Sequence, residues 1–318
     1  ILADIATPVQ VAALLTALKC TGQELDPAIL GAASSVFLRE ARLIPRADHE
    51  LWLDIVGTGG DGHNTFNVST ASSILVAGAG CKVAKHGNRS ASSMSGSADV
   101  LEALGCRLAA LTPADVAPCL AQSNFCFLYA PTYHPAMGKV AAVRSQLGFR
   151  NLFNWLGPLL NPARPGAMVV GVSDPAIAPA YVATLQRLGL RRGWVVYGEP
   201  ARPGTAGMDE ISPFGPTRVW EFVDAVSPPR ERVVTPADFG ITAHYTLADV
   251  TGGDPAANAA TMRALLAGQL TGAVLDFVLM NAGALLHVGG RAATLAEGYA
   301  LAKHAIDSGA AAAQLDAF

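Results

Sequence analysis

The chain has 318 residues, of which 51% are hydrophobic and 15% are charged, and its formal net charge is -3. This composition excludes a disordered chain, and the length predicts about two globular domains. The slight acidity gives no reason to expect nucleic acid as a partner. No apolar stretch approaches the ~20 residues that a membrane-spanning helix needs, so we expect no membrane association.

The five cysteines have no C-x-x-C spacing. Their odd number and their spacing indicate neither a disulfide framework nor a zinc site. A reducing, cytoplasmic location is the simplest expectation. The chain begins at Ile1, which leaves open that an N-terminal segment such as a targeting peptide has been removed.

Residues 1–48 have a helical pattern. Thr7-Pro8 and Asp26-Pro27 each place a capping residue before a proline, which is typical of a helix N-terminus. Apolar residues at helical spacing follow, among them Val11 and Leu15. We expect two or more packed helices that carry no chemistry of their own.

An alternation of apolar strand, turn and helix begins at Leu51 and predicts an α/β fold, in which helices flank a mostly parallel central sheet. The expected strands are 51–56, 82–85, 125–130, 167–173 and 193–198. The segment from Thr112 to Asp115 resembles a helix start with a weak capping box.

Residues 134–162 interrupt this alternation with helical spacing, and we expect them to pack on the N-terminal helices. After residue 200 we expect a Pro/Gly-rich loop, antiparallel or irregular strands to about 246, and alanine-rich helices from 255 to the end, the last of which Asp307-Ser308-Gly309 would fray. The predicted domains are a small all-helical one (1–48 and 134–162) and a larger α/β one (49–133 and 163–318).

A candidate anion site lies in the run GTGGDGHNTFNVST, which starts at Gly57. Glycine lets the backbone approach a ligand, and a helix N-terminus offers free N–H groups, so phosphate is the expected ligand. Asp61 would repel a phosphate and should face a sugar hydroxyl, a backbone amide or a metal ion. We expect Lys85 and Arg89 to supply mobile positive charge from the next loop, followed by a run of serines.

Gly57-x-Gly59-x-x-Gly62 matches the dinucleotide-binding fingerprint literally. That fingerprint also needs an acidic residue at the end of the second strand, where this chain has Lys85-His86. A Walker loop is not indicated either, because no Gly-Lys-Ser/Thr follows the glycines.

Asp209-Glu210 lies in a Gly/Pro-rich loop, where adjacent carboxylates are ordinarily a solvated turn. A phosphate site elsewhere favours a second interpretation, since Mg²⁺ binds one or two carboxylates together with water and substrate phosphate. Arg144 either forms a surface salt bridge or binds a carboxylate through two nitrogens of its guanidinium. The same two interpretations apply to Arg150, with less support for the second. His134 indicates a structural hydrogen bond rather than a base.

Nine motifs occur in order between about residues 57 and 259, and together they resemble the anthranilate phosphoribosyltransferase family: GTGGDG, NTFNVST, KHGNRSASS, SGSADVLEALG, HPAM, VRSQLG, NWLGPLLNP, MDEIS and GGDPAANA. The resemblance implies a pentosyltransferase of tryptophan biosynthesis. Such an enzyme transfers the phosphoribosyl group from 5-phosphoribosyl 1-diphosphate to the amino group of anthranilate. The resemblance also implies a homodimer formed through the helical domain.

By position, the resemblance implies a set of site residues. Phosphoribosyl diphosphate would be bound by Gly57, Gly60, Asp61, Thr65, Asn67, Val68, Ser69, Thr70, Lys85, His86, Gly87, Asn88, Arg89, Ser90, Ala91, Ser92, Ser93 and Ser97. Anthranilate would meet Gly57, Asn88 and Arg144, and Mg²⁺ would be held by Ser69, Asp209 and Glu210. No general acid or base is assigned, because an aromatic amine is neutral at pH 7.

The chain departs from the family pattern in three places. Met94 stands where many relatives have lysine, Asn151 replaces a common threonine, and Ala109-Ala110 adds one residue. Two alternatives stay open. A pyrimidine nucleoside phosphorylase of the same fold would begin its glycine loop with Lys-His-Ser, and a non-catalytic, nucleic-acid-binding relative would have a basic surface.

Overall fold

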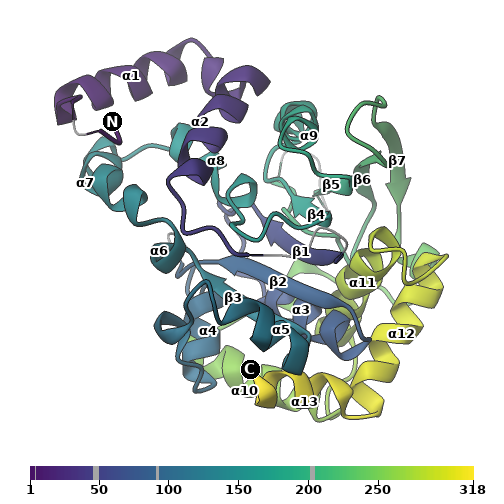
Figure 1. The fold of residues 1–318 in the computed structure, drawn as a ribbon. Helices are drawn as coiled ribbons and strands as arrows, with labels where there is room; N and C mark the ends of the chain where they lie inside the picture. Colours follow the sequence, from purple (N-terminus) through teal and green to yellow (C-terminus); the bar gives the residue numbers. More distant parts are fainter. Residues whose placement is uncertain (4, 46–49, 91–92, 201–204) are drawn as a thin grey trace.

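The computed structural model describes residues 1–3, 5–45, 50–90, 93–200 and 205–318, and a seven-stranded sheet lies at its centre (Figure 1). The strands, in chain order, are β1 (Trp52–Gly57), β2 (Lys82–Gly87), β3 (Phe125–Tyr129), β4 (Ala167–Gly171), β5 (Arg192–Gly198), β6 (Thr217–Phe222) and β7 (Arg230–Val234). Their order across the sheet is β3-β2-β1-β4-β5-β6-β7. The first five are parallel to one another, and β6 and β7 add antiparallel pairs. The predicted α/β class with a mostly parallel sheet is confirmed.

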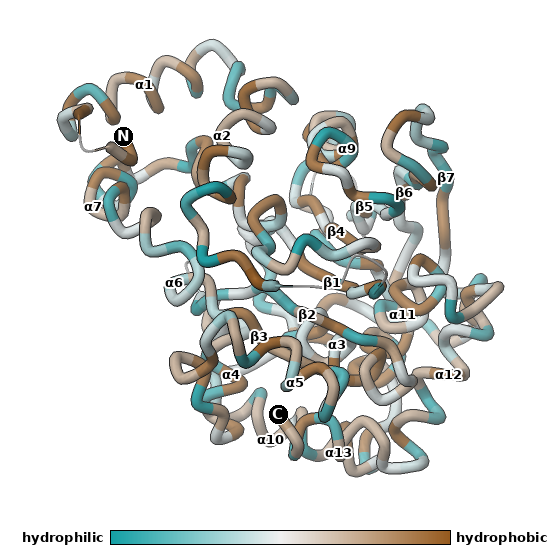
Figure 2. Tube along the Cα trace, viewed as in Figure 1, coloured by the Kyte–Doolittle hydropathy of each residue, from teal (hydrophilic) through white to brown (hydrophobic). Residues whose placement is uncertain are grey.

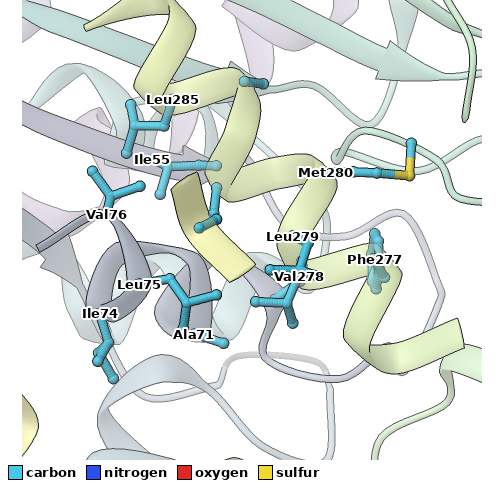
Figure 3. Close-up of a cluster of buried hydrophobic side chains, with 14 of the residues drawn as sticks. Ile55, Ala71, Ile74, Leu75, Val76, Phe277, Val278, Leu279, Met280 and Leu285 are labelled. Carbon is cyan, nitrogen blue, oxygen red and sulfur yellow. The ribbon is translucent and has the colours of Figure 1, made fainter. Parts of the chain in front are cut away.

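One face of the sheet is covered by α3 and by helices from the last quarter of the chain. These helices are α3 (Val68–Gly78), α10 (Pro255–Leu266), α11 (Ala273–Val288), α12 (Leu295–Asp307) and α13 (Ala310–Ala317). Figure 3 shows Ile55 of β1, Leu75 of α3 and Leu285 of α11 in the core that they share. This core anchors the strand and the helix that flank the glycine loop.

The opposite face carries a second core around α9 (Ala178–Arg187) and α2 (Pro27–Arg39). Because successive side chains of a strand point to opposite faces, neighbouring residues enter different cores. Val169 of β4 packs in the first core and Val170 in the second. The strands are therefore hydrophobic on both faces, as the brown segments inside the molecule indicate (Figure 2).

The N-terminal helices begin where the capping signals predict. Thr7 accepts a hydrogen bond from the N–H of Gln10 at the start of α1 (Pro8–Cys20), and Asp26 accepts two at the start of α2. Helix α1 lies against α7 (Gly138–Leu147) and α8 (Leu152–Trp155), which follow it by more than a hundred residues (Figure 1). This contact agrees with the expected packing of segment 134–162, while the domain division remains a prediction.

The remaining elements are short. They are α4 (Ser97–Ala103), α5 (Val116–Ser123), α6 (Ala130–Tyr133) and seven 3-10 turns in the described residues (Gln23–Leu25, Leu108–Ala110, Pro135–Met137, Gly157–Leu159, Pro175–Ile177, Pro236–Phe239 and Leu247–Val250). None of the helices in the described ranges is long and apolar enough to cross a membrane.

Two predicted boundaries differ from the structure. Asp115 does accept hydrogen bonds from the N–H and hydroxyl of Thr112, but these close a turn, and α5 begins only at Val116. Residues 308 and 309 do not merely fray the last helix, because Gly309 has a φ of 75° and separates α12 from α13. Both errors come from local patterns that also fit a turn.

Candidate active site

The glycine loop, which we define as Thr58 to Gly62, follows the carboxyl end of β1. Strand β1 lies between β2 and β4, where the chain order of the sheet reverses, and ligands of such sheets bind at the carboxyl ends of the strands at this point. In this loop Gly59, Gly60 and Gly62 have φ values of 67°, 75° and 82°. Residues with a Cβ rarely adopt this conformation, so the glycines determine the shape of the loop.

Asp209 and Glu210 meet the glycine loop from a distant part of the chain. An oxygen of Asp209 accepts a hydrogen bond from the N–H of Gly59 at 2.6 Å, and Glu210 accepts one from the hydroxyl of Thr65 at 3.3 Å. A Cβ on Gly57 would lie 2.2 Å from the same Asp209 oxygen. The pair is therefore not the solvated turn of the ordinary interpretation.

The two carboxylates are crowded with negative charge. Burial, followed by the nearby Asp61, raises the pKa of Asp209. Burial, followed by Asp209 and Asp61, raises the pKa of Glu210 well above its usual value. Lys85 is the cation that lowers the pKa of Glu210. A site in which carboxylates oppose one another favours a proton or a bound cation.

The surroundings of this pair fit Mg²⁺. A small cavity of about 10 Å³ is lined by Ser69, Asp209 and Glu210 among others. Hydroxyl and carboxylate oxygens are the hard ligands that Mg²⁺ prefers. In the described part of the chain no three His, Cys, Asp or Glu residues form a metal-binding group. Two carboxylates suffice for an ion that completes its shell with water and substrate phosphate.

Lys85 corrects one expectation, because it is not a mobile charge in a loop. It lies in β2, is 2% exposed, and donates to the carbonyl of Ile55 at 2.7 Å and to the hydroxyl of Ser69 at 3.2 Å. Burial lowers its pKa. Buried Asp54 lies close enough to raise it, and Asn161 donates to Asp54 at 2.8 Å. Lys85 thus holds Ser69 toward the carboxylate pair.

Asn67 is the residue before α3 and joins three segments of the chain. Its amide nitrogen donates to the carbonyl of Ser95 at 3.0 Å, and its oxygen accepts from Asn258 at 2.9 Å. Val68 and Thr70 have no exposed surface, so their side chains are not presented to a ligand. Ser69, in the first turn of α3, is the partly exposed hydroxyl of this group.

The second loop, after β2, combines fixed and exposed groups. His86 is buried against the ring of His134, and burial, as the largest cause, lowers the pKa of His86 to about 3. It is therefore neutral and is not a general acid at pH 7. Arg89 is exposed and pairs with Glu102 at 2.8 Å. Asp99 of α4 accepts the N–H of Ser90 at 2.9 Å and so closes the loop.

The other predicted residues of this loop are distributed around it. Asn88 accepts from the N–H of Arg89, Ser90 and Ser93 hydrogen-bond to each other, and Ser97 donates to the carbonyl of Asn88. Gly87 has no room for a side chain, since a Cβ would lie 2.4 Å from the hydroxyl of Ser97. Ala91 and Ser92 lie outside the described residues.

The two arginines of segment 134–162 behave differently. Arg144 is half-buried above the ring of Phe153 at 5.9 Å, and no acceptor within the described ranges binds its guanidinium. Arg150 lies over Trp155 at 4.2 Å and donates to the carbonyls of Gly59 and Gly60. Arg144 is thus available to a ligand, whereas Arg150 is committed to the glycine loop.

Sequence reasoning missed Ser173, which follows β4. Its N–H donates to the hydroxyl of Thr58 at 3.1 Å and its own hydroxyl accepts from Arg150 at 3.2 Å. It also missed Asp54, whose position inside β1 reads as part of a strand. The signal for Ser173 was available, because the carboxyl ends of β1 and β4 must adjoin if these strands are neighbours.

The fold and site are those of a glycosyl transferase with an α/β domain, and comparisons with known proteins agree. A model described as "Glycosyl transferase family, a/b domain" matches residues 49–312. An anthranilate phosphoribosyltransferase of Natronomonas pharaonis is 47% identical over 310 residues, which cover 98% of this chain and 89% of that relative. The chain belongs to this glycosyl transferase family and, within it, to the anthranilate phosphoribosyltransferases of tryptophan biosynthesis.

Solved structures give the same result. The anthranilate phosphoribosyltransferase of Thermus thermophilus has a TM-score of 0.88 at 41% identity, covering 99% of this chain and 90% of that one. The Saccharomyces cerevisiae enzyme in complex with PRPP and Mg has a TM-score of 0.90 at 31% identity, covering 100% and 88%. The same yeast enzyme in complex with 4-fluoroanthranilate has a TM-score of 0.87 at 30% identity, covering 99% and 87%. The family and activity that the motifs predict are confirmed.

Proposed function

We propose that this chain binds 5-phosphoribosyl 1-diphosphate at the glycine loop, α3 and the loop after β2, and forms N-(5-phosphoribosyl)anthranilate and diphosphate there. The observation that carries the assignment is the hydrogen bond between Gly59 and Asp209, which brings an anion-binding loop and a carboxylate pair together at the reversal point of the sheet. A diphosphate with its metal needs both parts in one place.

Ser69, Asp209 and Glu210 would hold Mg²⁺. When bound, the ion supplies positive charge that stabilises the departing diphosphate. Lys85 positions the hydroxyl of Ser69 for this role, and the N–H of Gly59 orients the carboxylate of Asp209. Asp61 lies beside Asp209 and accepts the N–H of His63 at 2.9 Å, and a backbone amide is one of the three partners expected for it.

Anthranilate would bind from the side of segment 134–162. Arg144 is half-buried and has no acceptor among the described residues, so its fork is free to grip the carboxylate of anthranilate. Asn88 and Gly57, at the ends of β2 and β1, would complete the pocket on the sheet side.

The reaction would be a displacement at C1 of the ribose. The bond from C1 to the diphosphate oxygen breaks through an oxocarbenium-like state, the bond from C1 to the amino nitrogen forms, and the nitrogen then loses a proton to solvent or diphosphate. The chain's task is to place the nucleophile and to stabilise the charge of the departing diphosphate with N–H groups. A neutral amine needs no strong base, which agrees with the low pKa of His86.

The assay that tests this function mixes the chain with phosphoribosyl diphosphate, Mg²⁺ and anthranilate and follows the loss of anthranilate fluorescence. We expect loss that depends on all three components. Absence of turnover, together with phosphorolysis of a pyrimidine nucleoside, would move the assignment to the nucleoside phosphorylases. A salt-sensitive affinity for nucleic acid without turnover would instead favour the non-catalytic alternative.

We further propose the two domains defined above, a homodimer formed through the helical one, and a cytoplasmic location. Ile5, Val9 and Leu14, at or near α1, are 84%, 78% and 47% exposed, which favours an apolar contact there. All five cysteines are free thiols, which suits a reducing compartment. Light scattering of the wild type should give twice the chain mass, and the Val9→Glu variant should give the mass of a monomer. A monomeric wild type would contradict the dimer.

A further inference from the structure

Arg150 is bound on three sides by groups of the active site. Its guanidinium donates to the carbonyl of Gly59 at 2.9 Å, to that of Gly60 at 3.1 Å and to the hydroxyl of Ser173 at 3.2 Å. The ring of Trp155 lies 4.2 Å from its central carbon. Nothing in the reaction outlined above uses this residue, although it joins segment 134–162 to the glycine loop.

The direction of these carbonyls determines where the neighbouring N–H groups point. The described peptide bonds are all trans, so the C=O and N–H of one peptide unit point to opposite sides. The carbonyls of Gly59 and Gly60 face Arg150, and the N–H groups of Gly60 and Asp61 therefore face away from it. In the described structure neither N–H donates to a protein acceptor.

We propose that Arg150 is a positioning residue for phosphoribosyl diphosphate: by holding the carbonyls of Gly59 and Gly60, it aims the N–H groups of Gly60 and Asp61 at an anionic group of the substrate. The inference rests on the proposed function and adds a residue to it. Carbonyl oxygens turned toward a phosphate would repel it, and the guanidinium removes that repulsion by satisfying them on the other side.

The glycine at position 60 is matched to this arginine. Its φ is 75°, and a Cβ there would lie 2.4 Å from a terminal nitrogen of Arg150. The loop is bound a second time by Asp209, which accepts the N–H of Gly59. Arg150 and Asp209 thus both bind the backbone at Gly59 and Gly60, so a change in either should shift the N–H groups of Gly60 and Asp61.

Arg150 also links the glycine loop to the part of the chain that carries Arg144. Both guanidiniums lie over aromatic rings of α8, Arg144 over Phe153 and Arg150 over Trp155. A lysine at 150 would keep the charge but lose the planar fork that reaches two carbonyls and a ring face together. Arg150→Lys therefore separates positioning from simple charge.

The test is isothermal titration calorimetry with phosphoribosyl diphosphate and Mg²⁺, beside steady-state kinetics for both substrates. For Arg150→Lys we expect Kd to weaken about ten- to a hundredfold and the anthranilate KM to change less than about twofold. The Tm should be unchanged. Arg232→Lys is the matched control. Arg232 lies on β7, four strands from β1, and its guanidinium is 4.8 Å from the ring of Trp194, so this variant should bind phosphoribosyl diphosphate like the wild type.

Each other result contradicts the proposal. Wild-type binding by Arg150→Lys would exclude a positioning role. Equal losses for both substrates with a lowered Tm would make the residue structural. A rise of the anthranilate KM alone would place the guanidinium on that substrate.

A second variant, Gly60→Ala, should weaken the Kd for phosphoribosyl diphosphate as well. The double variant should lose little more affinity than either single variant. Additive losses would contradict a shared loop.

The proposed function can fail separately. A wild-type chain that binds phosphoribosyl diphosphate without converting anthranilate would contradict that function, while the calorimetric comparison would still decide the role of Arg150. A wild-type chain that does not bind phosphoribosyl diphosphate would overturn both.

Discussion

The carboxylate of Asp209 accepts a hydrogen bond of 2.6 Å from the backbone N–H of Gly59, across 150 residues of sequence. Gly171 of β4 permits this contact, because a Cβ there would collide with the backbone carbonyl of Asp209. The carboxylate pair Asp209-Glu210 and the glycine loop are therefore joined directly, and a change in either should affect both.

Asp209→Asn should lower the affinity for Mg²⁺ at least about tenfold, because an amide oxygen carries no net charge. The variant should still fold, since that oxygen can accept from Gly59. A Mg²⁺ titration of the activity measures the change, with exposed Asp316→Asn on α13 as control. An unaltered titration would remove Asp209 from the metal site.

Arg144→Ala should raise the anthranilate KM about ten- to a hundredfold, which is the loss expected for a charge-assisted hydrogen bond. The KM for phosphoribosyl diphosphate should change far less, since Arg144 has no contact with the glycine loop among the described residues. The anthranilate KM of Arg144→Lys should lie between that of the wild type and that of Arg144→Ala. Equal rises in both KM values would refute the assigned role.

Asp54→Asn should change how stability depends on pH. Burial, as the largest cause, raises the pKa of Asp54 from 3.8 to about 6. A raised carboxyl pKa contributes stability below the unfolded value that is lost as pH rises through the folded value, here between about pH 4 and 6. As pH rises through this window, the free energy of unfolding of the variant should therefore increase by roughly 3 kcal/mol relative to that of the wild type.

Denaturant unfolding of both proteins at pH 4.5 and pH 7.5 measures this difference. The comparison cancels the buried carboxyls that both proteins share, Asp209 and Glu210 among them. A difference between variant and wild type that stays constant with pH would mean that Asp54 titrates normally.

Gly171→Ala should destabilise the fold by about 3 kcal/mol or more, because the new Cβ meets backbone that cannot rotate away. Gly215→Ala is the control, since no heavy atom lies within 4 Å of a Cβ there and its φ is ordinary; it should cost less than about 0.5 kcal/mol. Thermal unfolding of both variants decides the matter. Similar Tm values would show that the segment around Asp209 can move aside.

Met94→Lys should lower the KM for phosphoribosyl diphosphate about two- to fivefold at low salt, and less at high salt, because an exposed cation attracts the diphosphate only through screened charge. Met94 is 60% exposed, and its N–H donates to the side-chain oxygen of Asn64, two residues after the glycine loop. An unchanged KM at low salt would mean that the missing lysine is not needed here.

The sequence by itself determined the first five strands, the first two helix starts and the family. Each of the five predicted strands lies within two residues of its observed bounds, because apolar runs between glycine or polar turns have few alternatives. The nine motifs identified the family because they occur in one order. Helix starts at Thr7 and Asp26 were equally local, since a cap needs only its own turn.

Tertiary structure decided which of these groups meet. The sequence predicts a mobile charge at Lys85, but the side chain is buried next to Ser69, because its position in β2 follows from the pairing of β2 with β1. The sequence leaves Arg150 open between a surface salt bridge and a carboxylate contact, and in the structure it binds the carbonyls of the glycine loop instead. Contacts over 90 to 150 residues depend on sheet order and side-chain burial, and no local pattern in the sequence records either.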